Sequence, residues 1–338
     1  MRVNGQKVKK IMVTGGAGFI GSNFIRYIHS HHRQVELVNY DKLTYAGNLE
    51  NLEGIADRYA FVQGDIQDAA RVEAALAGVD VVVNFAAETH VDRSIHDPGD
   101  FILTDVYGVF VLLEAMKKSG AVKRFIHVST DEVYGSIANG CFDENSPLNP
   151  SSPYAASKAG GDRLAYSYFR TYGLPVLIAR PANNYGPYQY PEKLIPFFLT
   201  RALQDQTLPL YGDGSNCRDW LYVEDTVRGI LTLIRKGEAG QAYNLGAGQE
   251  RSNNDVTRQI LRRLGKPESL IRRVADRQGH DFRYALDWAK IRDLGWEPHT
   301  EFEEGLSRTM DWYLGHESWW KKLIAKQDYV SHLRKNYE

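Results

Sequence analysis

The sequence has few cysteines and no long apolar segment. Only Cys141 and Cys217 occur among 338 residues, which excludes a disulfide framework. Neither cysteine has metal-ligand spacing with the histidines, so we expect two unpaired thiols and no metal site. No stretch approaches the roughly 20 apolar residues needed to span a bilayer. We therefore expect a protein that does not associate with membranes.

An excess of charge of one sign is also absent. Lys and Arg together number 41 and Asp and Glu number 42, which gives a formal charge of −1. This balance argues against general nucleic-acid binding. Residues 1–7 lack the apolar core of a signal peptide, so a cytoplasmic location is the expectation. The chain has no internal repeat and no low-complexity tract.

A glycine-rich turn near the N-terminus is the first positive signal. The apolar run 11–13 leads into Gly15, Gly18, Phe19, Ile20 and Gly21. Glycine permits a tight turn, lets backbone N–H groups approach a pyrophosphate, and allows the next helix to pack closely on the sheet. The pattern predicts the first turn of a dinucleotide-binding fold.

An acidic residue follows at the spacing expected for ribose binding. Asp41 ends the strand-like run 36–41 and lies 20 residues after Gly21. A carboxylate there can bind both ribose hydroxyls and repels a 2′-phosphate, so we expect NAD rather than NADP. Two further strand-like runs, 61–66 and 81–87, are expected to bring Asp65, Ile66 and Ala86 to the cofactor.

The pattern of elements predicts the fold class. Strand-like runs alternate with helical periodicity from residue 9 to about residue 180. This favours an α/β, Rossmann-type, doubly wound parallel sheet with helices on both faces. Helices are expected at 22–31, 69–76, 101–119 and 154–172, and the run 176–180 is expected to close this half.

Prolines mark the change to a second region. Pro181, Pro187, Pro191 and Pro196 predict that loops dominate up to Trp220. We place an NAD-binding domain at 1–186 and a smaller, mixed α/β substrate-binding lobe at 187–338. The chain is expected to return to the first domain near 221–250 and 300–316.

A cluster of proton-transfer groups lies in the middle of the chain. Tyr154 and Lys158, four apart on a helix, share one face, so the ammonium is expected to lower the pKa of the phenol from about 10 toward neutrality. Thr130, Asp131 and Glu132 follow an apolar strand. The non-catalytic alternatives are a strand-end cap for Thr130 and a solvent-exposed position for the acidic pair. A site that holds the Tyr154 phenol and two carboxyls has three proton-transfer groups, which is more than simple alcohol oxidation requires.

Several runs carry a resemblance to a known family. The chain resembles the extended short-chain dehydrogenase/reductase family, and more closely the nucleotide-sugar 4,6-dehydratases of the dTDP-glucose type. The glycine turn and the Tyr-x-x-x-Lys pair are shared across that superfamily, whereas Thr-Asp-Glu followed by Val-Tyr-Gly is narrower. The matching runs are 14–21, 43–49, 86–94, 129–135, 152–158, 183–189, 191–196, 218–225 and 276–281.

The resemblance implies a reaction in three parts. Tyr154 takes the proton of the 4-hydroxyl while NAD takes hydride from C4, and Lys158 also reaches the nicotinamide ribose. Thr130 holds the 4-hydroxyl. Glu132 then removes the C5 proton and Asp131 protonates the departing 6-hydroxyl. Hydride returns to C6 and Glu132 reprotonates C5.

The resemblance also implies substrate and subunit contacts. A nucleotide-diphospho-sugar is the expected substrate, and a homodimer through a four-helix interface is the expected assembly, formed by the helix 97–118 and the Tyr154 helix. The substrate-binding positions that match the family are His90, Thr130, Asn183, Lys193, Tyr211, Arg218, Asn253, Arg277, His280 and Tyr337.

Several alternatives stay open at this point. Pro181 and Ala182 depart from the family pattern, which bears on the choice of hexose. A UDP-glucose or UDP-N-acetylhexosamine 4,6-dehydratase is the runner-up. A UDP-sugar 4-epimerase is another, although an epimerase has no C5 proton for Glu132 to remove. The non-enzymatic alternative is an NAD-binding regulatory protein.

Overall fold

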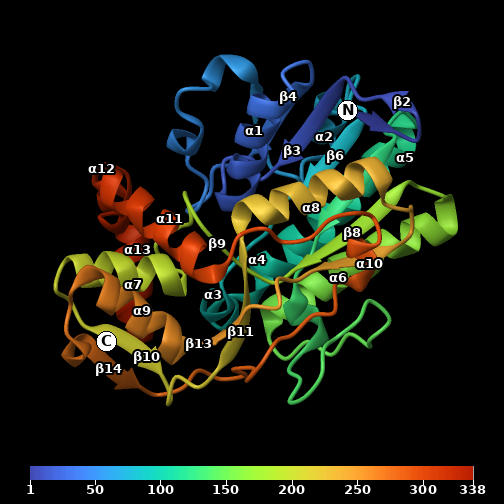
Figure 1. Cartoon of the computed structure of the whole chain (residues 1–338). Coiled ribbons are helices and arrows are strands. Elements are labelled where there is room, and N and C mark those ends of the chain that lie inside the picture. Colours follow the sequence, from blue (N-terminus) through green and yellow to red (C-terminus); the bar gives the residue numbers. More distant parts are fainter. Residues whose placement is uncertain (338) are drawn as a thin grey trace.

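A seven-stranded parallel sheet organises the N-terminal half of the chain. The structure is a computed structural model that describes residues 1–337 (Figure 1). The strand order is β12-β8-β7-β6-β3-β4-β5, and the order reverses around β3, the first strand of this sheet along the chain. The strands are β3 (Lys10–Thr14), β4 (Glu36–Asp41), β5 (Ala60–Gln63), β6 (Val81–Asn84), β7 (Arg124–Val128), β8 (Val176–Pro181) and β12 (Ala242–Leu245).

Helices cover both faces of this sheet. On one face, α1 (Phe19–His31) and α8 (Val223–Lys236) pack on side chains such as Val13 and Val83. On the other, α2 (Ala69–Ala75), α5 (Val109–Ser119) and α6 (Pro153–Tyr172) pack on Met12 and Val82. Alternate residues of a strand point to opposite faces, so β3 and β6 are buried on both sides. The predicted doubly wound α/β fold is confirmed.

The helix expected at 97–118 contains an irregular turn. It begins as α4 (Pro98–Ile102), passes through a π-helical segment at Leu103–Gly108, and continues as α5. The π segment lies against α6, where a Cβ on Gly161 would clash with the carbonyl oxygen of Asp105. Single π turns often occur at functional sites. The expectation of one long helix is therefore confirmed, and the π turn within it brings Asp105 close to α6.

The second region has its own core, which lies at the lower left of Figure 1. Strands β9 (Asn183–Tyr185), β11 (Cys217–Tyr222) and β13 (Glu250–Ser252) form one sheet, and β10 (Leu208–Tyr211) pairs with β14 (Ile271–Val274). The helices packed there are α7 (Leu194–Leu203), α9 (Asn253–Leu264), α11 (Phe302–Gly315), α12 (Glu317–Ile324) and α13 (Gln327–Tyr337).

Short elements complete the chain. A hairpin of β1 (Arg2–Val3) and β2 (Gln6–Lys7) precedes the sheet, and α3 (Val91–His96) and α10 (Ala289–Arg292) are brief helices. The short 3₁₀ turns are Leu49–Leu52, Ala56–Arg58, Asp131–Tyr134 and Glu268–Leu270.

Two of the expected boundaries are wrong. The stretch up to Trp220 contains α7 and β10 rather than mainly loops. Pro196 is the third residue of α7, and a first-turn residue has no intrahelical partner for its N–H, so proline fits there. The run 176–180 does not close the sheet either, because Ala242 of β12 pairs in parallel with Ile178.

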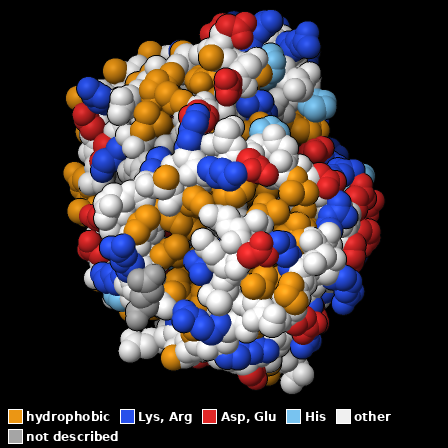
Figure 2. Space-filling view, turned by 90° about the vertical axis from the view of Figure 1, so that its left-hand side faces the viewer, with side chains coloured by type: hydrophobic (Ala, Val, Ile, Leu, Met, Phe, Trp, Pro, Cys, Tyr) orange, Lys and Arg blue, Asp and Glu red, His pale blue; other side chains and the backbone are white. Residues whose placement is uncertain are grey.

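The remaining expectations from composition can be compared directly. Cys141 and Cys217 are both free thiols, as predicted. Among residues 1–337, no helix has both the length and the apolar character needed to cross a bilayer. Lys, Arg, Asp and Glu side chains are mixed over the face shown in Figure 2, in agreement with a formal charge of −1.

Candidate active site

A cavity of about 340 Å³ lies at the carboxyl ends of the central strands. This is the place where the strand order reverses, and doubly wound folds bind ligands there. Every residue predicted to catalyse the reaction or to bind the cofactor lines it. These are Gly15, Gly18, Phe19, Ile20, Gly21, Asp41, Asp65, Ile66, Ala86, Thr130, Asp131, Glu132, Tyr154 and Lys158.

The glycine turn leaves room for a ligand at the start of α1. Gly15 has a φ of 67°, and a Cβ there would lie 2.7 Å from the backbone nitrogen of Ala86. A Cβ on Gly21 would clash with the carbonyl oxygen of Gly15. The first turn of α1 can therefore approach the end of β6 closely and offer its free N–H groups to an anion. This geometry fits the pyrophosphate of a dinucleotide.

Asp41 is held in place by the backbone. Its Oδ2 accepts a hydrogen bond from the Ala17 N–H at 2.9 Å, and its Oδ1 accepts one from the Leu43 N–H at 2.8 Å. Burial raises the pKa of this carboxyl, and the two hydrogen bonds oppose the rise. A carboxylate has further lone pairs to offer. The side chain is thus oriented at the end of β4 and can still accept ribose hydroxyls.

A 3₁₀ turn after β7 positions the acidic pair. Thr130 caps the turn: its Oγ1 accepts a hydrogen bond from the Glu132 N–H at 3.3 Å and donates one to Asp131 Oδ1 at 3.1 Å. Thr130 is also close enough to Tyr154 to oppose the rise of the phenol's pKa. Tyr154 sits in the first turn of α6, which Ser152 caps. The structural alternative for Thr130, a cap, is therefore confirmed. The same side chain also lies beside Asp131 and Tyr154.

Both carboxyls of the pair have raised pKa values. Burial, followed by the charge of Glu132, raises the pKa of Asp131 well above its usual value. Its Oδ2 is buried and has no hydrogen-bond partner within residues 1–337. Burial also raises the pKa of Glu132, but Arg277 and Arg218 oppose this. The site therefore makes Asp131 the better proton holder and Glu132 the more readily ionised partner.

The expected effect of Lys158 on Tyr154 is wrong for this structure. Burial, Glu132 and Asp105 raise the pKa of Tyr154 well above its usual value. Burial also lowers the pKa of Lys158, whose Nζ donates a hydrogen bond to the carbonyl oxygen of Val128 at 2.9 Å. The spacing placed both side chains on one face of a helix. It could not show how deeply they are buried or which carboxylates surround them.

A buried acid beneath the catalytic helix was not predicted. Asp105 Oδ2 accepts a hydrogen bond from Ser157 Oγ at 2.8 Å, and its Oδ1 accepts one from the Glu88 N–H at 3.2 Å. Burial raises the pKa of Asp105 to about 6 and that of Glu88, which lines the cavity, to about 7. The only sequence signal was an acidic residue within an apolar helical pattern.

The predicted substrate residues fall into two groups. Asn183 and Lys193 line the cavity itself. Most of the others surround Asp92, whose Oδ2 accepts a hydrogen bond from the Tyr211 hydroxyl at 3.0 Å and whose Oδ1 lies 3.5 Å from Arg277 Nη1. The ring of Tyr211 packs against His280 and Tyr337. We call this group the Asp92 cluster: His90, Asp92, Tyr211, Arg277, His280 and Tyr337.

Two further predicted substrate residues belong neither to the cavity lining nor to the Asp92 cluster. Arg218, on β11, donates hydrogen bonds to the carbonyl oxygens of Cys217, Asp281 and Phe282. It is close enough to Asp131 and Glu132 to oppose the rise of both pKa values. Asn253 begins α9 and is buried.

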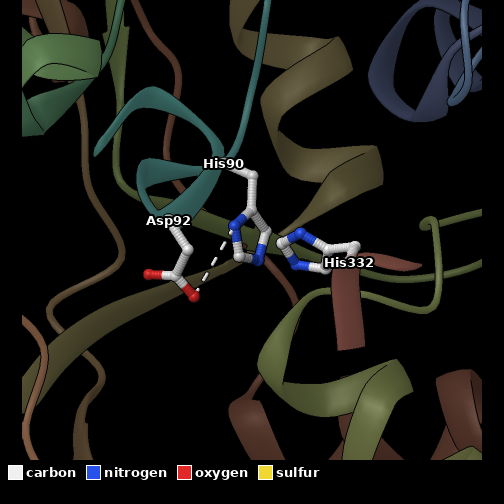
Figure 3. Close-up of side chains that lie close together, drawn as sticks. All are labelled: His90, Asp92 and His332. Atoms are coloured by element: carbon white, nitrogen blue, oxygen red, sulfur yellow. Dashed lines mark ion pairs between the residues drawn. The ribbon is translucent and has the colours of Figure 1, made fainter. Parts of the chain in front are cut away.

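His90, Asp92 and His332 come close together although the first and third are 242 positions apart in sequence (Figure 3). His90 Nδ1 lies 3.8 Å from Asp92 Oδ2, and His332 reaches them from α13. Such a trio can hold a metal ion, but here both Asp92 oxygens already face Tyr211 and Arg277. Burial, then the charges of Lys193 and His332, lowers the pKa of His90. This cationic setting favours an anionic ligand over a metal cation.

Unpartnered polar atoms mark the same region. His90 Nδ1, Asn183 Oδ1, Asn253 Oδ1 and Arg277 Nε are buried and lack a hydrogen-bond partner among the described residues. A buried polar atom without a partner costs about 1–3 kcal/mol. All four atoms belong to residues that the sequence resemblance predicts to bind the substrate. Their lack of partners indicates a site for a polar ligand.

The chain shares most of its length with proteins of known family. A profile of the family described as GDP-mannose 4,6 dehydratase matches residues 12–309. The dTDP-glucose 4,6-dehydratase of Streptomyces niveus is 50% identical over 94% of this chain and 97% of that protein. The low-salt glycan biosynthesis protein Agl12 of Haloferax volcanii is 50% identical over 90% of this chain and 98% of its own length.

Solved structures agree with the fold. DesIV, the dTDP-glucose 4,6-dehydratase of Streptomyces venezuelae solved with NAD bound, has a TM-score of 0.91 and 51% identity, and the match covers 93% of this chain and 99% of that one. The UDP-glucose 4-epimerase of Thermus thermophilus has a TM-score of 0.84 and 31% identity over 91% of this chain and 99% of its own. The chain therefore belongs to the extended short-chain dehydrogenase/reductase family, among its nucleotide-sugar 4,6-dehydratases of the dTDP-glucose type.

Proposed function

We propose that this protein dehydrates dTDP-glucose to dTDP-4-keto-6-deoxyglucose and water, using NAD that returns to its oxidised form in each cycle. The observation that carries the proposal is the adjacent pair of the buried Asp131 and the partly buried Glu132, which shares one cavity with Tyr154 and the glycine turn. An acid and a second base beside the phenol are what elimination needs in addition to oxidation. The relatives at 50% identity include named dTDP-glucose 4,6-dehydratases.

NAD fits the residues of the cavity. The N–H groups at the start of α1 suit its pyrophosphate, and Asp41 suits the adenosine ribose and disfavours a 2′-phosphate. Asp65, Ile66 and Ala86 line the adjoining wall. Bound there, NAD supplies a hydride acceptor at C4 and later a hydride donor at C6.

The chain's own groups move the protons. Tyr154 receives the proton of the 4-hydroxyl, and Thr130 orients that hydroxyl. Oxidation at C4 acidifies the C5 proton, which Glu132 can remove because Arg277 and Arg218 favour its ionised form. Asp131, whose pKa burial raises, holds the proton that the 6-hydroxyl needs to leave as water.

The Asp131–Glu132 pair favours a dehydratase over an epimerase. A 4-epimerase oxidises C4 and returns hydride to the same carbon, so it has no C5 proton to remove. Two adjacent carboxyls with raised pKa values, one of them fully buried, would then serve no step and would still cost free energy to desolvate. The likeness to epimerase structures at 28–31% identity reflects the shared fold.

We propose that the nucleotide binds between the cavity and the Asp92 cluster. Arg218, Arg277 and Lys193 supply cations for the diphosphate, and the unpartnered Asn253 Oδ1 and His90 Nδ1 supply polar contacts. In this proposal residues 1–186 hold NAD, together with the returning segments 221–250 and 300–316. Residues 187–338 mainly hold the nucleotide sugar.

We also propose a homodimer in the cytoplasm. Ile102, Leu103, Tyr107 and Phe110 are large apolar side chains exposed along the helical stretch that packs beside α6. Pairing this stretch and α6 with a second copy would give a four-helix interface and cover these side chains. The exposed free thiol of Cys141 agrees with a reducing compartment.

The interface predicts a change of mass on mutation. Leu103→Lys places a charge in the proposed interface and is expected to convert a dimer to a monomer in light scattering at micromolar concentration. Leu314→Lys, at another exposed apolar position on α11, is the matched control and should leave the dimer intact. A wild-type monomer, or a dimer that survives Leu103→Lys, would refute the proposed interface.

The function is tested with three substrates in parallel. Purified protein with added NAD is incubated with dTDP-glucose, UDP-glucose and UDP-N-acetylglucosamine, and the products are weighed by mass spectrometry. We expect loss of one water from dTDP-glucose at the highest rate. Faster loss of water from a UDP-sugar would show that the substrate is a UDP-sugar rather than dTDP-glucose. A product of unchanged mass with a new sugar configuration would show an epimerase.

A further inference from the structure

Glu192 is a buried carboxylate that links three parts of the chain. Its side chain is 1% exposed. Its Oε1 accepts a hydrogen bond from the Tyr45 hydroxyl at 2.9 Å, and its Oε2 accepts one from Arg93 Nε at 3.1 Å. Its backbone carbonyl oxygen, which can only accept, lies 3.3 Å from His90 Nε2. Glu192 therefore joins the loop after β4, the short helix α3 and the segment that leads into α7.

Tyr45 is held through both its ring and its hydroxyl. Arg93 Cζ lies 3.7 Å from the centre of the Tyr45 ring. The Tyr45 hydroxyl also lies 2.8 Å from the carbonyl oxygen of Thr89, so its single proton is shared between two acceptors. Arg93 in turn donates a hydrogen bond to Asp328 of α13 at 3.1 Å. The orientation of Tyr45 is thus fixed by neighbours from other segments.

The loop that carries Tyr45 forms a wall of the cofactor site. Its Leu43 N–H donates a hydrogen bond to Asp41 Oδ1 at 2.8 Å. Its Asn48 N–H donates one to the carbonyl oxygen of Ala17, in the glycine turn, at 3.0 Å. Tyr45 itself lines the cavity. The loop is therefore attached to both places that are proposed to hold NAD, and contacts that fix Tyr45 also fix this wall.

The backbone of Glu192 belongs to the opposite side of the cavity. Lys193 follows it directly and is the N-cap of α7. Lys193 also lines the cavity and is one of the cations proposed for the diphosphate. His90, which faces the Glu192 carbonyl oxygen, is a member of the Asp92 cluster. The main chain of Glu192 thus lies at the nucleotide site, while its side chain reaches the cofactor loop.

A role in stability alone does not account for this arrangement. A buried ion pair adds little net stability compared with apolar side chains of similar size, because removing both charges from water offsets their attraction. Glu192 moreover lines the cavity. Its place between the two ligand sites indicates that it holds both of them.

We propose that Glu192 is a positioning residue that couples the two sides of the cavity, so that a nucleotide and NAD each strengthen the binding of the other. The inference rests on the proposed dehydratase function and deepens it. Ordering side chains around a ligand costs binding free energy. When one ligand has fixed Glu192 together with Tyr45 and Lys193, the second ligand binds to side chains that are already ordered. Such coupling acts equally in both directions.

The coupling suits a reaction in which hydride leaves C4 and returns to C6. Between these two steps the reduced cofactor has to stay beside the 4-keto sugar, since its release would end the reaction before the return. A bound nucleotide that holds Glu192 in place also helps to retain the cofactor through Tyr45. The cofactor is therefore held most firmly during the interval in which it must not leave.

Calorimetric titration measures the coupling without turnover. The protein is titrated with NAD in the absence and in the presence of saturating dTDP. In the wild type we expect dTDP to tighten NAD binding about tenfold. Tyr45→Phe removes the hydroxyl that Glu192 holds and keeps the ring beside Arg93, so dTDP should change its NAD affinity less than about twofold. Equal NAD affinities of the wild type with and without dTDP would overturn the inference, as would full coupling in Tyr45→Phe.

Tyr190→Phe is the matched control. The centres of the Tyr190 and Tyr45 rings are 5.4 Å apart, and both residues line the cavity. The Tyr190 hydroxyl is buried and has no hydrogen-bond partner among residues 1–337. Because Glu192 does not hold this hydroxyl, its removal should leave the effect of dTDP on NAD binding unchanged. Loss of the effect in both tyrosine variants would mean that the cavity wall in general, and not Glu192, links the sites.

Glu192 itself is tested by a double-mutant cycle. Glu192→Gln keeps the size of the side chain but removes the charge that Arg93 holds, so it should also lower the coupling. If Tyr45 acts through Glu192, the double variant should have the same coupling as the more weakly coupled single variant, because neighbours in one network do not act additively. Losses that multiply in the double variant would show that Tyr45 acts independently of Glu192 and would contradict the proposal.

Failure of the coupling and failure of the function can be told apart. A wild-type protein that dehydrates dTDP-glucose but binds NAD and dTDP independently refutes the coupling alone. A wild-type protein that couples the two ligands but leaves dTDP-glucose unchanged refutes the proposed reaction and leaves the coupling intact. A protein that binds neither ligand refutes both.

Discussion

Two buried aspartates, Asp131 and Asp162, lie in similar depth but in opposite electrostatic settings. Asp162, on α6, is fully buried, and Arg180 holds it through Nε at 2.8 Å and Nη2 at 3.0 Å. Burial alone would raise the pKa of Asp162, but Arg180 and Arg163 lower it. Asp131 forms no such ion pair within residues 1–337, and its neighbour Glu132 raises its pKa further. Both carboxyls are buried to a similar depth. The neighbouring charge therefore decides whether the ionised or the protonated form of each is stable.

The presence or absence of a cationic partner distinguishes a carboxyl that stabilises the fold from one that can take part in catalysis. A paired carboxylate stays ionised and fixes neighbouring elements, here α6 and β8. An unpaired buried carboxyl stores a proton near neutral pH, which general acid catalysis requires. The energetic cost of leaving Asp131 without a cation is consistent with a functional site, where local stability is often given up.

The largest effect should separate activity from stability at Asp131. Asp131→Asn is expected to lower kcat by a factor of about 10² to 10⁴, because the amide cannot donate a proton to the 6-hydroxyl. Its Tm should stay unchanged or rise, because a neutral amide replaces a carboxyl that is costly to ionise. Steady-state assays and thermal melts test this. A large fall in Tm would place Asp131 with the structural acids.

The opposite outcome is expected at Asp162. Asp162→Asn leaves the guanidinium of Arg180 buried without its counter-charge, which costs about 3–5 kcal/mol of unfolding free energy. Urea denaturation measures the change. The matched variant Asp162→Asn with Arg180→Met removes both charges and should recover part of the loss. A single variant as stable as wild type would contradict the comparison.

A pH dependence should reveal the unpaired acids. Burial, then Asp105, raises the pKa of Glu88 to about 7 from 4.5. The folded state thus holds a proton that the unfolded state releases, and this stabilisation is present below pH 4.5 and is lost as the pH rises to about 7. Glu88→Gln should therefore gain about 1–3 kcal/mol relative to wild type across that window. A difference that does not change with pH would refute the assignment.

The smallest effect is expected at a third buried carboxyl, whose partners are backbone N–H groups. Asp41→Asn removes the charge that opposes a 2′-phosphate but can keep one of the two backbone hydrogen bonds. The ratio of NADP to NAD affinity should rise about tenfold. Calorimetric titration of the cofactor-free protein with each dinucleotide measures it. An unchanged ratio would mean that Asp41 does not select the cofactor.

Local patterns were enough for the fold and for the position of the cofactor cavity. The glycine turn, the run before Asp41 and the strand before Thr130 each have short-range signals, and parallel strands bring their ends to one edge. The helix α7 was missed because Pro196 was interpreted as a breaker, although its place in the first turn makes it harmless. The return of the chain near 221–250 was expected, but the pairing of β12 with β8 at the sheet edge was not, because pairing partners 64 residues apart leave no local signal.

Electrostatics could not be predicted in the same way. The Tyr154 and Lys158 spacing indicated contact on a helix but not the burial that raises the pKa of Tyr154. Asp105 reaches the catalytic helix only because a π turn and Gly161 allow close approach. His90 and His332 meet through the return of α13 across the molecule. Each of these depends on tertiary packing, which spacing does not encode.

The central claim is that the unpaired acids beside Tyr154 serve elimination rather than simple oxidation. The direct measurement is turnover of dTDP-glucose in D₂O, with the product analysed by NMR and mass spectrometry. The account predicts a 4-keto-6-deoxy sugar that has lost one water and carries deuterium at C5, because Glu132 exchanges its proton before returning it. A sugar that keeps its water and has no deuterium at C5 would contradict the account.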